Sequence, residues 1–260
     1  MKTVLGRKQA TDNALWVAAT AHIEDYVTRE ELAERTDAAA TAIREHTDGK
    51  RAAFAWSGGK DSIVLADICR KAGITDCVFA HSELEYPAFL AWCLANRPEG
   101  CEVINVGLDL DWLSTHQEML FPKSKGLNRW YQLIQRKAFT QYFFAHELDV
   151  LLVGHRRADG NVVGSDGIVT KKSGETRYAP LADWPHELIL AYVHYHGLPL
   201  PPIYGWKNGY RCGTHPWPSR MYMGSAEQGY REVYEIDPEI VLRAAEKLSS
   251  ARHFLEGVQA

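Results

Sequence analysis

The segment best suited to chemistry is the hexapeptide SGGKDS at 57–62, which follows a short apolar run and precedes a helical pattern. Glycines without Cβ atoms let a backbone wrap closely around an anion, and a helix N-terminus adds free N–H groups. The pattern predicts a phosphate or pyrophosphate site, whereas the simpler alternative is a tight strand-to-helix turn with a plain helix cap. The residues that we expect to bind phosphate are Ser57, Gly58, Gly59, Lys60, Asp61 and Ser62.

Two charged residues of this loop are candidates for catalysis. Lys60 is expected to supply a mobile positive charge to the phosphates. Asp61 could help to hold a Mg²⁺ ion that bridges phosphate oxygens, since hard cations take oxygen ligands, or it could cap the following helix. Both interpretations stay open at this point.

A second candidate is the sequence GHRR, in which Gly154, Arg156 and Arg157 directly follow another apolar run. In open parallel sheets, ligands bind beyond the carboxyl ends of the strands. We therefore expect the two guanidinium groups to clamp a phosphate, sulfate or carboxylate, with Arg157 taking part in catalysis. The alternative is an arginine pair that forms an ion pair with Asp159.

The stretch 119–146 contains no Asp or Glu but several basic residues among its aromatics. Seven residues, or two helical turns, separate Arg129 from Arg136, so the two are expected on one face. The strip could receive the triphosphate or a polyanionic second substrate such as nucleic acid. The acidic net charge of the chain favours the other interpretation, an amphipathic helix with solvated charges. The basic residues of the strip are Lys123, Lys125, Arg129, Arg136 and Lys137.

The segment 198–220 is too rich in proline and glycine for regular structure, and long loops of this kind are often functional. Its aromatic residues favour an ordered loop that shapes the site of the second substrate. Tyr210 is a candidate substrate contact. His215 could contact substrate or form a structural hydrogen bond.

The elements that must position these residues alternate between short apolar runs and helical patterns. This alternation predicts an α/β fold with a doubly wound, mostly parallel sheet, helices on both faces, and an irregular, helical C-terminal region. A turn at 171–174 separates two short strands, Asp183 caps a helix that ends at Gly197, and Asp237 with Pro238 opens a final helix. Strands are expected at 52–56, 77–80, 103–106 and 149–154, and helices at 28–45, 61–71, 88–95, 111–120 and 127–147.

The length and composition of the chain are consistent with this fold. The 260 residues, 46% apolar with a net charge of −4, indicate one large globular domain. We divide it into a helical extension at 1–48, a nucleotide-binding core at 49–184, and a region at 185–260 that completes the site within the same domain. Five scattered cysteines without CxxC spacing suggest reduced thiols, and no segment resembles a signal peptide or membrane span. We expect a cytoplasmic protein that makes no contact with a membrane.

The hexapeptide SGGKDS resembles the PP-loop of the ATP pyrophosphatases within the adenine nucleotide alpha-hydrolase group, and more narrowly the phosphoadenylylsulfate (PAPS) reductase-like branch. Further segments resemble the same branch in the same order, over about 51–215. The resemblance implies a Rossmann-like, HUP-type fold that binds ATP or a related adenine nucleotide. The matching segments are HSELEYP at 81–87, RW at 129–130, LLVGHRRADG at 151–160, PLADW at 180–184 and GY at 209–210.

The chain departs from the reductases of that branch. Those enzymes use a cysteine in a C-terminal ECG-(I/L)-H sequence, and the adenylylsulfate-specific type adds paired cysteines for an iron–sulfur cluster. Here no cysteine follows Cys212, and no CC pair precedes PLADW. Cys212 lies in RCGTH directly after GY, so its likeness to the catalytic tail is accidental, and no iron–sulfur cluster is expected.

Without a tail thiol, the sulfonucleotide has no obvious attacking nucleophile. The sequence therefore predicts an enzyme that binds ATP and Mg²⁺ and adenylates a second substrate with release of pyrophosphate. Sulfur transfer and nucleobase or nucleic-acid modification are the candidate outcomes, and a homo-oligomer or a modification-complex partner stays open. The alternatives are a PAPS or adenylylsulfate reductase that uses Cys212, and a nucleotide-binding subunit without chemistry.

Overall fold

The computed structural model describes residues 1–7, 10–122, 124–220 and 225–259, and its centre is a six-stranded sheet. The strand order is β3-β2-β1-β4-β6-β5, with every pair parallel except β5 and β6. The expected strands are confirmed, and the turn at 171–174 joins β5 to β6. The strands are β1 (Ala52–Trp56), β2 (Cys77–His81), β3 (Glu102–Asn105), β4 (Val150–Leu152), β5 (Ile168–Thr170) and β6 (Thr176–Tyr178).

The order of crossovers creates a switch point at the centre of the sheet. From β1 the chain moves outward through β2 to β3, and it then returns to the other side of β1 to form β4. The loops after β1 and β4 therefore separate in opposite directions, which opens a crevice at their carboxyl ends. This is the doubly wound α/β architecture that the alternation of elements predicts.

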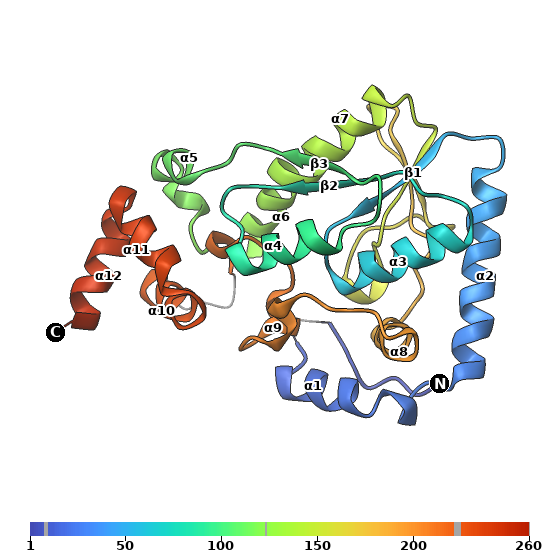
Figure 1. Cartoon of the computed structure of the whole chain (residues 1–260), viewed down its shortest axis with the longest axis horizontal. Coiled ribbons are helices and arrows are strands. Elements are labelled where there is room, and N and C mark those ends of the chain that lie inside the picture. Colours follow the sequence, from blue (N-terminus) through green and yellow to red (C-terminus); the bar gives the residue numbers. More distant parts are fainter. Residues whose placement is uncertain (8–9, 123, 221–224, 260) are drawn as a thin grey trace.

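Helices cover both faces of the sheet (Figure 1). On one face α3 packs against α2 and α8, and on the other α7 and the π-helical turn η3 contact β2. Part of the expected 111–120 helix is a 3₁₀ turn, η2. The bounds are α2 (Arg29–Thr47), α3 (Lys60–Lys71), α4 (Pro87–Asn96), α5 (Leu110–Thr115), η2 (Gln117–Met119), α6 (Ser124–Tyr131), η3 (Gln132–Arg136), α7 (Lys137–Ala145) and α8 (His186–His196).

Local sequence signals account for several helix ends. Thr28 caps α2 in a complete capping box with Glu31, and Gly197, at φ +60°, ends α8. The predicted cap at Asp183 is wrong, because α8 begins three residues later with Pro185 at its N-cap position. The Asp183 carboxylate instead forms an ion pair with Arg157.

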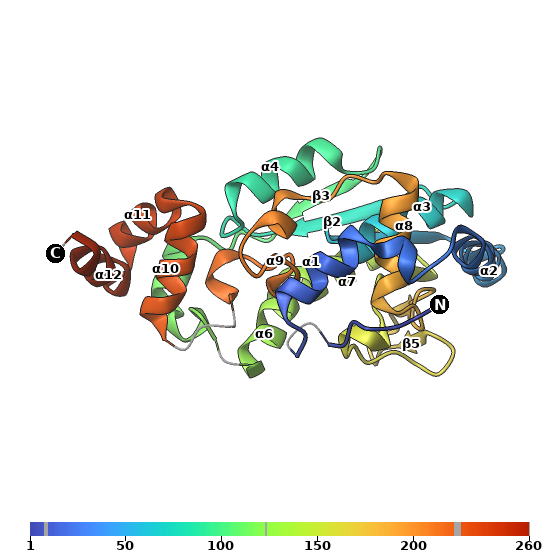
Figure 2. The same ribbon diagram turned by 90° about the horizontal axis from the view of Figure 1, so that it is seen from below.

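The two ends of the chain add further helices (Figure 2). The helix α1 contacts α8 and α9, whereas α10–α12 lie together at one end of the molecule, where α11 contacts α5. Asp237 caps α11 as expected, but the predicted final helix is two helices, and α10 was not predicted. The bounds are α1 (Asn13–Ala21), η1 (Ile23–Asp25), η4 (Arg157–Asp159), η5 (Pro202–Gly205), α9 (Gly209–Cys212), η6 (Trp217–Ser219), α10 (Ala226–Ile236), α11 (Pro238–Lys247) and α12 (Ser249–Gln259).

The hydrophobic core joins the sheet to both helical layers. Buried side chains run from the N-terminal helix, through the strands and α8, to the C-terminal helices. All five cysteines are buried, and none forms a disulfide. Within the described part of the chain, no helix combines the length and the apolar character needed to cross a membrane.

Candidate functional site

The conformation of the loop after β1 is fixed by its own glycine and serine residues. Gly58 has φ +67°, and a Cβ atom there would lie 2.4 Å from the Sγ atom of Cys93, so only glycine fits. The Ser57 amide donates to the Ser62 hydroxyl at 3.0 Å, and that hydroxyl donates to the Gly59 carbonyl at 2.9 Å. These bonds fix the loop as a closed turn at the N-terminus of α3, where backbone N–H groups favour an anion.

The end of β4 closes directly on this loop. A Cβ atom at Gly154 would lie 3.3 Å from the Asp61 carbonyl carbon, so a side chain at this position would press against the start of α3. The glycine thus allows the two central strands to bring their following loops into contact. The sequence segments 57–62 and 154–160 meet at the switch point of the sheet.

Behind the loop lies a buried network of charges. The Lys60 side chain is 0% exposed, and its Nζ atom lies 2.9 Å from each carboxylate oxygen of Asp61. The Arg156 guanidinium, also 0% exposed, contacts Asp61 at 2.8 Å and Asp159 at 2.7 Å. Its second terminal nitrogen donates to the Trp184 carbonyl at 2.8 Å. This network ties α3 to the loop after β4 and to the segment that precedes α8.

This geometry corrects two expectations. Lys60 is not a mobile charge, because it is enclosed and its ammonium group is held by Asp61. Arg156 is not half of an anion clamp, because its guanidinium is buried among Asp61, Asp159 and a carbonyl. The alternative interpretation, ion pairing with Asp159, is the one that the structure shows.

His186 belongs to the same buried network. Its Nδ1 atom lies 3.0 Å from an Arg156 nitrogen, and burial, with the charges of Arg156 and Lys60, lowers the His186 pKa to about 3. The ring is therefore neutral near pH 7 and accepts the arginine N–H. The Trp16 ring from α1 meets it edge-on, with the ring centroids 4.6 Å apart.

Arg157 points to a different set of partners. It forms an ion pair with Asp183 and donates to the carbonyl oxygens of Gly164 and Ser165, the latter at 3.1 Å. It holds the loop before β5, and it does not line the cavity described below. The structure therefore gives no support to the expected catalytic role of Arg157.

Asp61 is poorly suited to hold a metal ion. Its carboxylate already contacts two cations, Lys60 and Arg156, which compete with Mg²⁺ for the same oxygens. Among the residues that the structure describes, no group of three His, Cys, Asp or Glu side chains could hold a metal ion. Asp61 does not cap α3 either, since the N-cap residue is Gly59 and no side chain bonds there. The side chains present thus do not fit a Mg²⁺ ion held by the protein.

A cavity of about 760 Å³ opens in front of the loop. This volume lies within the roughly 300–1,000 Å³ typical of small-molecule sites. Its lining combines the loop after β1, the loop after β4, the hairpin β5–β6, the helix around η3, and the segment 211–215. The loop residues that line it are Ser57, Gly59, Asp61 and Ser62, followed by Gly154 from the end of β4.

Four cationic side chains line this cavity: Arg136, Lys171, Arg177 and Arg211. We call them the cationic wall. Among the described lining residues, the carboxylates are those of Asp61 and Asp159, and both contact Arg156. The cavity therefore carries an excess of positive charge, which favours an anionic ligand.

The strands β5 and β6 hold two members of the wall in place. Arg177 contacts the fully buried Glu175 and donates to the Tyr131 hydroxyl at 2.6 Å. Its remaining terminal nitrogen is buried and has no hydrogen-bond partner among the described residues. Lys171 lies close to Arg177. Burial and the positive charge of Arg177 together lower the pKa of Lys171 to about 8.

The family of the chain follows from its match to a known domain. The phosphoadenosine phosphosulfate reductase domain matches residues 51–213, which is more than half of the chain. The chain belongs to this family. The match confirms the resemblance of SGGKDS and its companion segments to the PAPS reductase-like branch of the adenine nucleotide alpha-hydrolases.

The fold agrees with that of a solved PAPS reductase. The PAPS reductase of Candida auris, in a phosphate complex, is 15% identical, with 70% of this chain and 94% of that chain covered at a TM-score of 0.50. A U34-tRNA thiolase of Methanococcus maripaludis, with its [4Fe-4S] cluster, is 16% identical over 99% of this chain and 85% of that chain, with a TM-score of 0.44. No curated protein matches the sequence at a significant level.

The cysteine that tests the reductase interpretation is enclosed. Cys212 lines the cavity, but it is only 5% exposed, and burial raises its pKa to about 11. The thiol is therefore protonated near pH 7, whereas thiol chemistry requires a thiolate. The environment of Cys212 argues against its use as the nucleophile of a reductase.

The basic strip divides in the structure. Arg136 lines the cavity, Lys137 is exposed and does not line it, and Arg129 lies 3.5 Å from the exposed Glu118. The π-helical turn between Arg129 and Arg136 is wider than an α-helical turn, so seven residues no longer return to one face. The expected shared face is therefore wrong. Lys123 and the side chain of Lys125 lie outside the described part of the chain.

The irregular loop supplies one of its two candidate contacts. His215 lines the cavity, whereas Tyr210 lies behind it. The Tyr210 ring stacks on Trp16 with centroids 5.6 Å apart, and its hydroxyl accepts from Thr20 at 3.2 Å. Tyr210 therefore supports Tyr204, whose hydroxyl accepts the Lys60 amide at 2.9 Å.

Sequence reasoning missed several lining residues. Lys171 was interpreted only as part of a turn, and Arg177 and Arg211 were not singled out. His155, between the expected Gly154 and Arg156, also lines the cavity, and burial with the nearby Arg177 lowers its pKa to about 4. Lys171 begins the turn of the hairpin and Arg177 lies in the middle of β6, and no motif or spacing in the sequence marked either as a lining residue.

Proposed function

We propose that this protein binds ATP with its phosphates on the loop 57–62 and transfers the adenylyl group to a second substrate, releasing pyrophosphate. Membership in the PAPS reductase domain family supports an adenine nucleotide as the ligand. The loop supports phosphate binding through its positive-φ Gly58 and the N-terminus of α3.

The observation that carries the proposal is the cationic wall across the cavity from this loop. Transfer of an adenylyl group leaves pyrophosphate with additional negative charge, and fixed cations stabilise such a leaving group. Arg177 and Lys171 lie on the hairpin β5–β6, and Arg177 is held by Glu175 and Tyr131. The wall thus takes the neutralising role that the sequence assigned to Lys60 and Arg157.

The chemistry requires one bond to form and one to break at phosphorus. A nucleophile on the second substrate forms a bond to the α-phosphorus, and the bond to the bridging oxygen breaks, so that pyrophosphate leaves with the electron pair. The protein contributes positioning and charge rather than a covalent intermediate. We propose a nucleobase, free or within a nucleic acid, as the second substrate. Its carbonyl oxygen is adenylylated, and sulfur or an amine then forms a bond to the carbonyl carbon while the carbon–oxygen bond breaks and AMP leaves with the electron pair.

Labelled ATP tests the proposal. With ATP labelled at the α-phosphate and candidate acceptors, we expect labelled AMP or an adenylylated acceptor together with pyrophosphate. The Arg177→Gln variant should lower the rate at least ten-fold, since it removes a cation held against the leaving group. Lys172→Gln, an exposed neighbour in the same hairpin, is the matched control and should leave the rate unchanged. ADP and phosphate as the sole products would contradict the proposal.

The other two interpretations give different results in the same preparations. A reductase should form sulfite from PAPS or adenylylsulfate in the presence of a thiol reductant, and Cys212→Ser should abolish it. A nucleotide-binding subunit should bind ATP in calorimetry without turnover. Cys212 lines the cavity, but its raised pKa keeps the thiol protonated near pH 7. We therefore expect no sulfite from either nucleotide.

A further inference from the structure

Two of the five cysteines lie side by side at the edge of the sheet. In the parallel pairing of β2 with β3, Val78 lies opposite Glu102, so the residues just before them, Cys77 and Cys101, are neighbours in the same register. Neighbouring strands lie about 4.7–4.9 Å apart, and the two Cα atoms of a disulfide lie about 4.4–6.8 Å apart. Both thiols are free in this structure, and the spacing of their strands suits a disulfide.

A hydrogen bond joins the two thiols. Cys77 donates to Cys101, and this bond is the main cause that lowers the pKa of Cys101, to which the positive charge of Arg97 adds. The same hydrogen bond, together with burial, raises the pKa of Cys77. Because the thiolate is the reactive form of cysteine, Cys101 is the more reactive member of the pair.

Cys101 is also the member of the pair that a small reagent reaches first. It directly precedes β3, which is the edge strand of the sheet. It is 9% exposed, whereas Cys77 is 0% exposed. An oxidant therefore meets the more reactive thiol first and finds the second thiol directly behind it.

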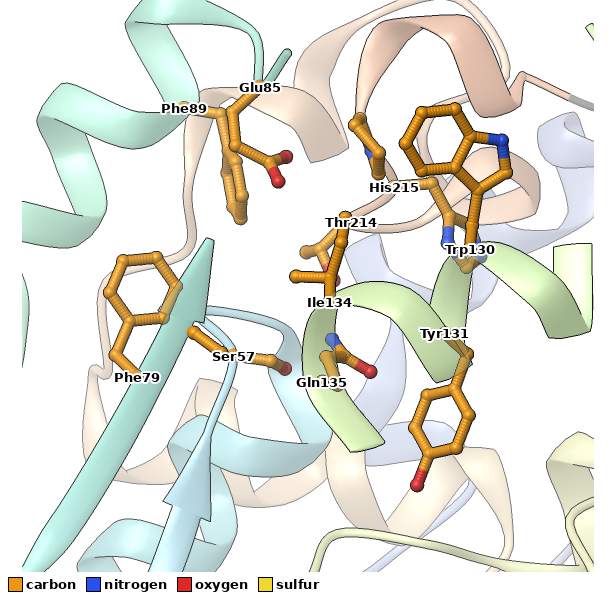
Figure 3. A pocket seen from close by; sticks show the side chains of 12 residues that line it. Ser57, Phe79, Glu85, Phe89, Trp130, Tyr131, Ile134, Gln135, Thr214 and His215 are labelled. Carbon is orange, nitrogen blue, oxygen red and sulfur yellow. The ribbon is translucent and has the colours of Figure 1, made fainter. Parts of the chain in front are cut away.

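The surroundings of the pair make a permanent charge on either sulfur costly. Alternate residues of a strand share a face, so Cys77 and Phe79 lie on one face of β2. Phe79 lines a small pocket together with Ser57 of the loop after β1 (Figure 3). A sulfinate at either cysteine would be a buried charge in the core that supports this loop.

We propose that Cys77 and Cys101 form a reversible disulfide when a peroxide reaches the protein, with Cys101 as the thiol that reacts first and Cys77 as its resolving partner. Neither residue lines the main cavity, so the inference adds a modification site outside the proposed nucleotide site. It does not depend on the ligand of the loop 57–62.

The reaction consumes one hydrogen peroxide for each disulfide. The Cys101 thiolate forms a bond to one peroxide oxygen, the oxygen–oxygen bond breaks, and hydroxide leaves with the electron pair. The Cys77 sulfur then forms a bond to the Cys101 sulfur, the sulfur–oxygen bond of the sulfenic acid breaks, and the departing hydroxide takes the Cys77 proton. The two thiols are oxidised and the peroxide is reduced to water.

Peroxide treatment of the full chain tests the pairing. Wild type, unfolded in guanidinium after the reaction, should have three titratable thiols in place of five, because the disulfide consumes two. Its mass should fall by that of two hydrogen atoms, peptide mapping should join residue 77 to residue 101, and dithiothreitol should restore both thiols. Cys101→Ser should keep all its remaining thiols. Cys93→Ser, which removes another buried thiol, is the matched control and should still lose two.

The Cys77→Ser variant tests the resolving role. In this variant, peroxide should add two oxygen atoms to Cys101, and dithiothreitol should not remove them, since a sulfinic acid is not reduced by thiols. The wild-type peptide map decides the pairing even where a variant fails to fold. Five thiols in treated wild type, a disulfide that uses Cys69 or Cys212, a link between two chains, or a fully reversible product in Cys77→Ser would each overturn the proposal.

Discussion

Two adjacent arginines illustrate how position decides the role of a residue. Arg156 is 0% exposed and contacts Asp61 and Asp159, whereas the Arg157 side chain is 36% exposed and contacts Asp183. Burial makes the first pair of contacts hard to replace, because a buried carboxylate without its cation is strongly destabilising. Exposed ion pairs contribute little, because water screens them.

This difference predicts unequal effects of the same substitution. Arg156→Gln should lower the free energy of unfolding by about 3–5 kcal/mol, since it leaves Asp61 and Asp159 short of a cation. Arg157→Gln should lower it by only about 1–2 kcal/mol, because water screens the ion pair with Asp183 and the loss comes from the hydrogen bonds to Gly164 and Ser165. Chemical denaturation of both variants measures the values, and equal losses would contradict the assignment of Arg156 to the buried network.

A substitution at Gly58 gives a second test of how the surroundings of one residue decide its effect. Gly58→Ala should cost about 2–4 kcal/mol of unfolding free energy and weaken ATP binding, because a positive φ and a contact with Cys93 both oppose the methyl group. Gly49 has almost the same φ, +66°, and a Cβ atom at that position would have nothing within 4 Å. Gly49→Ala should therefore cost only about 1 kcal/mol and leave ATP binding unchanged.

Among the elements, the short hairpin β5–β6 supplies two of the four side chains of the cationic wall. It continues the sheet beyond β4, and it places Lys171 and Arg177 in the wall that faces the loop after β1. Glu175, from the same hairpin, is fully buried and contacts both cations. One short element thus carries both the cations and the carboxylate that orients them.

The Lys171 pKa of about 8 predicts a pH dependence of nucleotide binding. Lys171 loses its positive charge as pH rises through about 8, so the affinity for ATP should fall between about pH 7 and about pH 9. Lys171→Arg keeps the charge and should flatten this fall, whereas Lys172→Arg should not. Titration calorimetry at the two pH values measures the affinity of each variant for ATP. A wild-type affinity that rises with pH would contradict the role of Lys171.

Across the whole molecule, segments from both ends of the chain are tied into the fold by hydrogen bonds and an ion pair. The backbone amides of Val4 and Leu5 each donate to the buried Glu187 carboxylate at 2.7 Å. Near the other end, Arg220 donates to the Tyr86 hydroxyl at 3.2 Å and lies 3.2 Å from Glu232 of α10. We infer that residues 1–48 and 185–260 form one folding unit with the core.

Buried histidines predict the acid sensitivity of this unit. His155 has a folded pKa of about 4, below its ordinary value of 6.5, so below about pH 6.5 the unfolded state binds a proton that the folded state refuses. The free energy of unfolding should therefore fall as pH decreases. The contribution of His155 is about 2 kcal/mol between about pH 6.5 and about pH 5.

His155→Gln should remove that part of the decrease, as measured by denaturant titration at the two pH values. His253→Gln, at an exposed position, is the control and should not change it. Glu85 acts in the opposite sense, because burial raises the pKa of its carboxyl in the folded state from 4.5 to about 7. Between these values the unfolded state releases a proton that the folded state still holds, so the free energy of unfolding falls as pH rises toward 7. An acid-induced decrease that His155→Gln leaves intact would contradict the burial of a neutral ring.

The parts of this protein that depend on local order could be predicted from the residues alone. Apolar runs and helical periodicity gave the parallel strands and their helices, and SGGKDS gave the family and the turn after β1. Glycines at 58 and 197 could be interpreted because a positive φ is a property of one residue and its neighbours. The capping box at Thr28 is equally local.

Which charges face the cavity depends on the tertiary fold. Lys60 and Arg156 lie in the expected segments, yet packing against Trp16, Asp159 and His186 buries them. Lys171 and Arg177 line the cavity instead, from a hairpin that the sequence predicts but to whose cations it assigned no role. Charge, burial and pKa depend on partners brought together from distant parts of the chain. The spacing of residues within one segment therefore leaves them undetermined.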